Sequence, residues 1–273
     1  MKKVISLFTA LIILTALCVP CFAADNIKVN VTIANGTLVL TNAEITVTDT
    51  DGDGKLTIND ALYAAHEKAY KGGAAAGYGS AATEYGLSLT KLWGVENGGS
   101  YGYYVNNASA LSLSDEIKAG DHINAFVYTD TTAWSDAYVY FDAFEKSAKE
   151  GGEVTLTLNE VGFDLDWNTV ALPVEGASIL IDGKDSGVKT NEKGKATITL
   201  DKAGTYTVSA SKEGKNIVPP VCALTVSAAQ TAEQPNTEPP KTGDAATVAV
   251  AALALVSGAG ALAFTFGRRK IED

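Results

Sequence analysis

The sequence has few of the side chains on which enzymes most often depend. Its 273 residues include two histidines, one methionine and three cysteines. Two of the cysteines lie in the apolar segment at the N-terminus, so Cys222 is the one thiol left for the mature chain and cannot form an internal disulfide. Because Cys222 lies in the apolar stretch VPPVCALTV, we expect a buried side chain rather than a nucleophile.

The motifs of the common catalytic sites are also missing. The sequence contains no nucleophile elbow, no phosphate-binding glycine loop and no zinc signature. Asp164 and Asp166 in FDLDWN could mimic the paired carboxylates of a glycosidase, but residues of this kind favour a polar turn. We therefore predict that no residue is catalytic and that the protein is not an enzyme.

Positive charge is scarce as well. Lysine and arginine total 21 against 32 aspartates and glutamates, which gives a net charge of -11. A surface of this sign repels the phosphates of nucleic acids, so we predict no nucleic-acid partner.

The chain begins with the pattern of a secretory signal. Lys2 and Lys3 precede an apolar run over residues 4–19, and small residues suited to cleavage end at Ala23. This layout predicts a signal peptide over residues 1–23 and a mature chain outside the cytoplasm. An N-terminal membrane helix is the alternative, which the shortness of the run disfavours.

A second apolar run lies near the C-terminus. Residues 245–266 are almost all small or apolar, which predicts a transmembrane helix, and the basic sequence RRK follows at residues 268–270. Basic residues after the span favour a cytoplasmic C-terminus. Residues 228–241 are rich in proline, glutamine, glutamate and threonine, which predicts a disordered linker.

The sequence PPKTG at residues 239–243 connects this linker to the span. Together with the span and the basic tail, it resembles the LPXTG-type sorting signal of Gram-positive cell-wall proteins, here over residues 239–273. The resemblance implies that a sortase cleaves between Thr242 and Gly243 and joins the chain to peptidoglycan. Pro239 stands where the family usually has leucine, which leaves open which sortase accepts the signal. A lasting membrane anchor with an incidental Thr-Gly pair is the alternative.

An acidic loop, DTDGDGKLTIND, occupies residues 49–60. Its spacing follows the twelve-residue EF-hand pattern, in which oxygens at fixed positions surround one calcium ion and Gly54 permits the sharp turn. The predicted calcium ligands are Asp49, Asp51, Asp53, Lys55 through its carbonyl, Thr57 and Asp60. The loop resembles the calcium loop of dockerin modules, although a single copy does not imply cohesin binding. An acidic turn without a metal is the alternative.

Residues after this loop have the period of an amphipathic helix. Ile58, Ala61, Leu62, Ala65 and Ala69 recur on one face, and KGG at residues 71–73 ends the pattern. His66 lies on the neighbouring face, where we expect a solvated side chain. His122 is expected at the start of a strand.

Strand patterns surround this helix over residues 24–145. Two alternating runs meet at Asn35 and Gly36, a strong hairpin signal, and further strands follow the helix. Two strands, a helix and more strands is the order of a β-grasp fold. The region resembles the β-grasp domain at the C-terminal end of transcobalamin-like proteins, and the residues that carry this likeness are Trp93, Tyr101, Tyr103, Tyr104, Asn106, Gly120 and Asp121. In transcobalamins this domain clamps a corrinoid together with a helical domain, which this chain does not contain.

Aromatic residues are frequent in the same region. Tyr101, Tyr103, Tyr104 and Trp134, with Tyr138 and Tyr140, form a candidate ligand platform for sugar or protein partners. A half-buried sheet is the alternative, since aromatic residues favour strands.

Residues 152–227 contain short alternating strands with glycine and aspartate turns, typical of a β-sandwich. They resemble the prealbumin-like or immunoglobulin-like modules that serve as stalks in Gram-positive surface proteins. The whole chain is therefore predicted to be mainly β with one principal helix: an α+β β-grasp head and then an all-β sandwich.

We predict a cell-wall-anchored surface protein with a calcium-stabilised adhesion or ligand-binding head. Its partners would be a sortase, peptidoglycan and an unidentified surface ligand, which could be a protein, a glycan or a corrinoid. Three alternatives remain open, namely capture of a corrinoid or other cofactor, a purely structural wall protein, and a glycan hydrolase.

Overall fold

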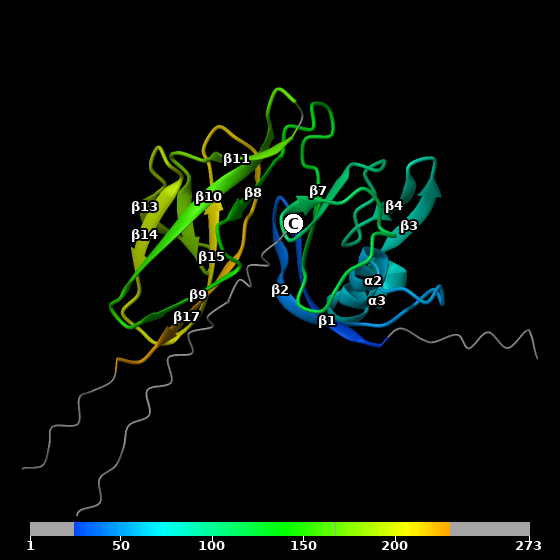
Figure 1. Ribbon diagram of the computed structural model, residues 1–273, viewed down its shortest axis with the longest axis horizontal. Coiled ribbons are helices and arrows are strands. Elements are labelled where there is room, and N and C mark those ends of the chain that lie inside the picture. Colours follow the sequence, from blue (N-terminus) through cyan, green and yellow to red (C-terminus); the bar gives the residue numbers. More distant parts are fainter. Residues whose placement is uncertain (1–24, 167, 230–273) are drawn as a thin grey trace, which may run out of the picture. The chain divides into compact units, whose positions relative to one another are not determined.

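The computed structural model describes residues 25–166 and 168–229 of the chain (Figure 1). We call residues 27–127 the head and residues 137–227 the sandwich. The predicted signal peptide, transmembrane span and sorting signal, and all but the first two residues of the predicted linker, lie outside the described residues. No helix within the described residues has the length and apolarity that a membrane span requires.

The head is built from seven strands and two helices. These are β1 (Ile27–Asn35), β2 (Thr37–Val47), α2 (Ile58–Ala69), α3 (Gly73–Gly77), β3 (Gly79–Thr83), β4 (Gly86–Lys91), β5 (Tyr101–Val105), β6 (Ala108–Ser109) and β7 (His122–Val127). The main sheet has the order β2-β1-β7-β5-β6, in which β1 is antiparallel to β2 and parallel to β7. The β3–β4 hairpin forms a separate sheet. The predicted hairpin at Asn35 and Gly36 is confirmed, and Gly36 has the positive φ of 67° that its turn requires.

Helix α2 packs against the main sheet through its apolar face. Ile58, Ala61, Leu62 and Ala65 are fully buried and share one core with β1, β2 and β7. The helix begins with a capping box, in which Thr57 is the N-cap and Asp60 is the third helical residue. The predicted principal helix is therefore confirmed, although Ala69 is exposed.

His66 contradicts the prediction of a solvated side chain, because it is fully buried. Its Nδ1 lies 2.6 Å from the Leu62 carbonyl oxygen, and its Nε2 accepts a hydrogen bond of 3.0 Å from the Trp93 backbone N–H. This pair of contacts requires the neutral ring with its proton on Nδ1. Burial accordingly lowers the pKa of His66.

The sandwich consists of two sheets of short strands. Its strands are β8 (Ala137–Phe141), β9 (Glu145–Lys149), β10 (Glu153–Phe163), β11 (Thr169–Pro173), β12 (Ser178–Ile181), β13 (Lys184–Lys189), β14 (Lys195–Thr199), β15 (Gly204–Ser211), β16 (Ile217–Val218) and β17 (Cys222–Ser227). One sheet has the order β11-β10-β8-β16, with β14 also paired to β10, and the other has the order β13-β12-β15-β17-β9.

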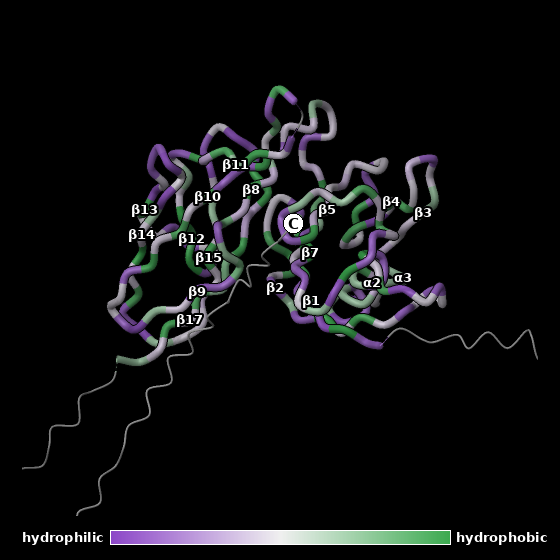
Figure 2. Tube along the Cα trace, in the orientation of Figure 1, coloured by the Kyte–Doolittle hydropathy of each residue, from purple (hydrophilic) through white to green (hydrophobic). Residues whose placement is uncertain are grey.

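Buried and exposed residues alternate along these strands, and the buried side chains fill the space between the two sheets. In β10, Val154, Leu156 and Leu158 are buried while their neighbours face outward, and hydrophobic and hydrophilic residues are interspersed along the strands in Figure 2. Cys222 is fully buried in this core, which confirms its predicted place. Over residues 25–166 and 168–229, the prediction of a mainly β chain with one principal helix is confirmed.

The boundary between head and sandwich differs from the prediction. The sequence pattern placed residues 24–145 in the head and began the sandwich at residue 152. In the structure β8 pairs with β10 and β9 pairs in parallel with β17, so the sandwich begins at Ala137. Val139 and Phe141 point into the sandwich core. Alternation identifies such a strand, but it does not reveal which sheet the strand joins.

Candidate functional site

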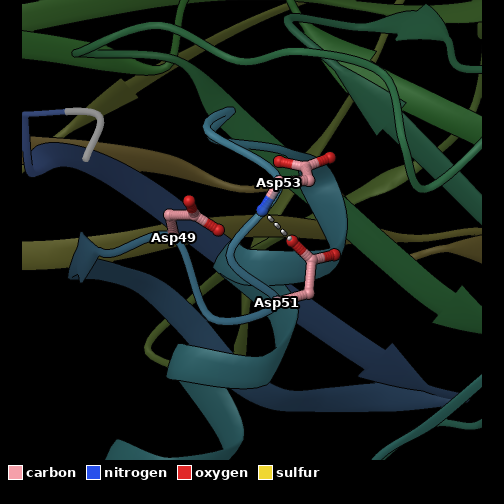
Figure 3. A group of neighbouring side chains, drawn as sticks. All are labelled: Asp49, Asp51 and Asp53. Atoms are coloured by element: carbon pink, nitrogen blue, oxygen red, sulfur yellow. Dashed lines mark hydrogen bonds between the residues drawn. The ribbon is translucent and has the colours of Figure 1, made fainter. Parts of the chain in front are cut away.

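Three carboxylates of the acidic loop between β2 and α2 lie close together (Figure 3). Asp49, Asp51 and Asp53 each offer an oxygen, and these oxygens all lie within 4.8 Å of one another. The side chains of Asp51 and Asp53 are exposed, and Asp49 is half-buried. The loop could therefore receive a cation directly from solvent.

Backbone hydrogen bonds fold the loop around Asp49. Its carboxylate accepts hydrogen bonds of 2.7 Å from the Gly52 N–H and 2.9 Å from the Gly54 N–H. The bond from Gly54 is the largest influence and lowers the pKa of Asp49. Partial desolvation raises the pKa of Asp51, and the neighbouring carboxylates, Asp53 first among them, act in the same direction. The charged form of Asp51 is thus disfavoured by its own environment and its neighbours.

Asp60, a predicted calcium ligand, is not grouped with these three residues. It is fully buried, and each of its carboxylate oxygens accepts two hydrogen bonds. One oxygen accepts from the Thr50 N–H at 2.9 Å and from the Thr50 hydroxyl. The other accepts from the Thr57 N–H at 3.0 Å and the Thr57 hydroxyl at 2.8 Å. Asp60 therefore ties the start of the acidic loop to the start of α2.

The two remaining predicted ligand positions lie at the end of the loop. Thr57 is buried as the N-cap of α2 and forms an isolated β-bridge with Glu116. The side chain of Lys55 forms an ion pair of 2.6 Å with Glu116 on the surface. The contribution of the Lys55 carbonyl to a calcium site stays a prediction.

The predicted aromatic platform is not a single surface. Tyr101 and Tyr103 pack against the head core, whereas Tyr104 belongs to another cluster and stacks on Tyr138 with ring centroids 3.6 Å apart. Successive residues of a strand face opposite sides, so Tyr103 and Tyr104 of β5 cannot share one face. Tyr138 is buried and donates a hydrogen bond of 2.9 Å from its hydroxyl to the Asn107 side chain.

An open cavity of about 410 Å³ adjoins two of the predicted platform residues, and we call it the aromatic groove. It is lined by Gly98, Gly99, Ser100, Tyr101, Tyr128 and Trp134. The sequence pattern missed Tyr128 and the loop at residues 98–100. The turn signal ENGGS predicted the loop itself. The loop lies beside Tyr128 because β5, which follows the loop, pairs with β7, which ends just before Tyr128.

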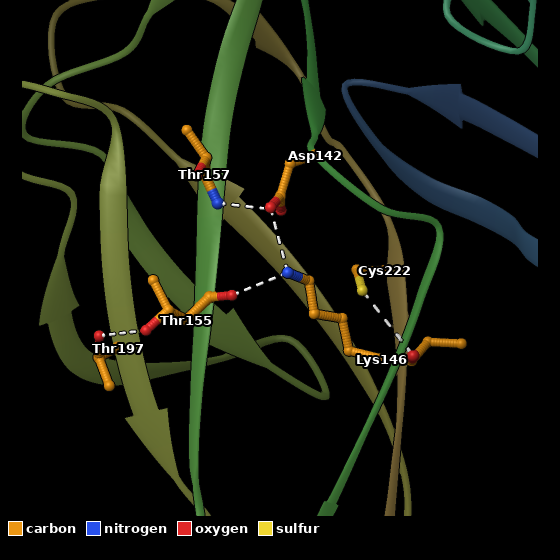
Figure 4. Close-up of polar contacts among 7 residues, drawn as sticks. Asp142, Lys146, Thr155, Thr157, Thr197 and Cys222 are labelled. Atoms are coloured by element: carbon orange, nitrogen blue, oxygen red, sulfur yellow. Dashed lines mark hydrogen bonds and ion pairs between the residues drawn. The ribbon is translucent and has the colours of Figure 1, made fainter. Parts of the chain in front are cut away.

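Polar groups of the sandwich are bound to one another in structural contacts (Figure 4). Lys146 pairs with Asp142 at 3.1 Å and donates a hydrogen bond of 2.9 Å to the Thr155 carbonyl oxygen. The Cys222 thiol lies 3.8 Å from the Ala223 carbonyl oxygen, and burial raises its pKa to about 11. A thiol in this state is a poor nucleophile at neutral pH.

The pair Asp164 and Asp166 lies in the predicted polar turn. The Asp164 carboxylate accepts hydrogen bonds from the backbone N–H groups of Asp166 and Asn168, at 2.9 and 2.8 Å, and one of 3.0 Å from the Asn168 side chain. The Asp164 carboxylate therefore stabilises the turn.

The C-terminal part of the chain matches a known family that attaches proteins to the cell wall. Residues 240–273 match the family described as the LPXTG cell wall anchor motif. The chain carries a cell-wall anchor. The protein is therefore an extracellular, cell-wall-anchored surface protein, and its anchor implies processing by a sortase and attachment to peptidoglycan.

Solved structures give only remote similarity, and no curated protein matches the chain. The fibronectin(III)-like modules of Clostridium thermocellum CbhA align with a TM-score of 0.27 and 11% identity, over 54% of this chain and 87% of theirs. The D0-D1 domain of intimin aligns with a TM-score of 0.26 and 16% identity, over 55% and 80%. The four N-terminal Ig domains of Dscam1 isoform 7.44 give 0.22 and 11%, and this chain spans 45% of that one.

Proposed function

We propose that this wall-anchored protein presents a calcium-stabilised, ligand-binding head of the β-grasp type at the cell surface, with the sandwich as its stalk. The observation that carries the proposal is the cluster of Asp49, Asp51 and Asp53 in one loop of the head. The sandwich lies between the head and the C-terminal anchor in the sequence, as a stalk does.

The topology of the head supports the β-grasp assignment. Its first and last long strands, β1 and β7, are parallel neighbours at the centre of the sheet, and β2 and β5 lie outside them. Helix α2 follows the first hairpin and packs on one face of the sheet. This is the order of two strands, a helix and further strands that suggested the fold.

The acidic loop fits the size of a calcium ion. Calcium binds oxygens at about 2.3–2.6 Å, so two ligands of one ion are at most about 5 Å apart. The oxygens of Asp49, Asp51 and Asp53 meet that limit, since they lie within 4.8 Å of one another. A bound calcium ion would offset two of the three negative charges, while the hydrogen bonds of Asp60 join the loop to α2.

Calcium would act in this head as a structural ion. An ion that binds the folded state alone raises the free energy of unfolding by about 2.7 kcal/mol when its free concentration is about 100 times its Kd. The loop would then be ordered outside the cell, where calcium is plentiful, and would loosen when a chelator removes the ion.

The test is a calcium titration of the secreted chain, residues 24–242, by calorimetry and by thermal unfolding. We expect one bound calcium ion and a Tm that rises with calcium concentration. The substitution Asp53→Asn should abolish both effects, because it removes one carboxylate of the cluster. Asp166→Asn, in the turn between β10 and β11, is the matched control and should bind calcium normally. A wild-type chain that binds no calcium at millimolar concentration refutes the proposal.

A further inference from the structure

Trp134 is presented to solvent by a strained and well-braced loop. Its side chain is 63% exposed, and its backbone has a φ of 51°, in the left-handed region that bulky residues rarely adopt. Strain of this kind persists only where the surrounding structure enforces it, and it is concentrated at functional sites.

Two aspartates, Asp130 and Asp136, hold the backbone around Trp134 in this conformation. The Asp130 carboxylate accepts hydrogen bonds from the N–H groups of Thr132 and Ala133, each at 3.0 Å, and from the Ser135 hydroxyl at 2.7 Å. These bonds hold the pKa of Asp130 at about 2. The Trp134 N–H itself donates to the Asp130 carbonyl oxygen at 3.1 Å.

Asp136 anchors the other end of the same loop. It is buried, and its carboxylate accepts hydrogen bonds from the N–H groups of Thr129 and Asp130 at 3.0 and 2.8 Å and from the Thr129 hydroxyl at 2.5 Å. The backbone of the loop is thus fixed on both sides of Trp134 before any ligand arrives.

The opposite wall of the aromatic groove is braced as well. The Asn97 side chain donates a hydrogen bond of 2.9 Å to the Ser100 carbonyl oxygen and accepts one of 3.1 Å from the Ser100 N–H. The Tyr101 hydroxyl lies 2.8 Å from the Thr90 carbonyl oxygen and 2.9 Å from that of Val95, and its one proton is donated between these two acceptors, so the ring is fixed beside the loop. Both walls are therefore built to hold one shape.

The lining of the groove combines exposed backbone with aromatic rings. Gly98 and Gly99 are exposed, and a Cβ atom built on either would meet nothing within 4 Å, although the Gly99 carbonyl oxygen accepts a hydrogen bond of 3.1 Å from the Tyr101 N–H. Tyr101, Tyr128 and Trp134 contribute aromatic rings to the groove, and no lining residue is charged. The cavity of about 410 Å³ lies within the range of about 300–1,000 Å³ typical of small-molecule sites.

We propose that the aromatic groove binds an uncharged sugar ring within a glycan chain. This inference rests on the proposed ligand-binding function of the head and names its ligand class. A pyranose ring has an apolar C–H face that can pack on the indole of Trp134, and a hydroxyl edge that can hydrogen-bond to the peptide groups of Gly98 and Gly99. A charged ligand would find no charged partner in the groove.

Such a glycan has two sources near a wall-anchored protein. One is the N-acetylhexosamine backbone of the cell wall, and the other is a neutral hexose polymer on a foreign surface. Both offer the same ring chemistry, so the test sugars must separate them. Chitohexaose represents the first source, whereas cellohexaose and mannohexaose represent the second.

The experiment titrates the secreted chain, residues 24–242, with each hexasaccharide, following tryptophan fluorescence and the heat of binding. We expect at least one sugar to bind, and Trp134→Ala to weaken that binding about tenfold or more, as for the central aromatic residue of a binding site. Trp134→Phe keeps an aromatic face and should recover most of the affinity. Tyr85→Ala removes an aromatic side chain that is 80% exposed elsewhere on the head and should change nothing.

Three results overturn the inference. The first is an absence of binding to all three sugars at millimolar concentration. The second is equal binding by the wild type and Trp134→Ala, with both shown to be folded by circular dichroism. The third is capture of a proline-rich peptide in place of sugar, because aromatic grooves also accept such peptides. Calcium titration of the same samples tells failure of the sugar site apart from failure of the proposed calcium site, since the two readouts are independent.

Discussion

The hydrogen bonds of Asp60 allow its structural role to be separated from a role in calcium binding. Asp60 is fully buried, and Asp60→Ala would remove the acceptor of the Thr57 N–H, which is buried, and of the Thr50 N–H, which is partly buried. Each lost hydrogen bond to a charged group costs about 1.5–3 kcal/mol, so the two together predict a loss of about 3–6 kcal/mol in the free energy of unfolding.

Asp60→Asn should cost about half as much. Its amide oxygen can still accept from one threonine, and the hydroxyl of the other can rotate to accept from the amide NH₂ group. One backbone N–H is then left without an acceptor, which predicts a loss of about 1.5–3 kcal/mol.

The assay is urea unfolding followed by tryptophan fluorescence, with a chelator present so that calcium cannot contribute. Asp53→Ala is the control, because its exposed carboxylate should matter little under these conditions. If Asp60→Ala changes the free energy of unfolding by less than about 1 kcal/mol in chelator but by much more in calcium, the capping argument fails and Asp60 is a metal ligand.

Three further outcomes are expected. Burial lowers the pKa of His66 below its ordinary value of 6.5, so the unfolded state binds more protons and the free energy of unfolding should fall as the pH drops below about 6.5. Urea unfolding at several pH values should show this slope, and His66→Gln should reduce it to the part that His122 contributes, whose pKa burial also lowers. Gly102→Ala should cost about 1–3 kcal/mol in the same assay, because the added Cβ would lie 2.2 Å from the Phe126 ring. Cys222 should resist a thiol reagent at pH 8 and react once urea unfolds the sandwich, since burial raises its pKa to about 11; rapid labelling of the folded chain would contradict its burial.

Local signals account for the parts of the fold that could be predicted from the sequence. Asn35 and Gly36 specify a tight turn, and the apolar period after Thr57 specifies α2, because neither depends on distant residues. The acidic loop is equally local, so its spacing was enough to group Asp49, Asp51 and Asp53.

The parts of the fold that could not be predicted from the sequence depend on contacts between residues far apart in the chain. The burial of His66 depends on the N–H of Trp93, 27 residues away in the chain. The place of β9 depends on β17, at the far end of the sandwich. Tyr128 joins the candidate ligand site because β5 and β7 pair, and no short window of sequence contains that information.

The parallel pairing of β9 with β17 has a mechanical consequence. The head is linked to the N-terminal side of β9 through β8, and the wall anchor follows the C-terminal end of β17. When a ligand pulls on the head, the tension therefore draws two parallel neighbours in opposite directions along their length. Their hydrogen bonds are loaded in shear and must yield together rather than unzip one at a time, so single-molecule stretching should find a high rupture force for this sandwich.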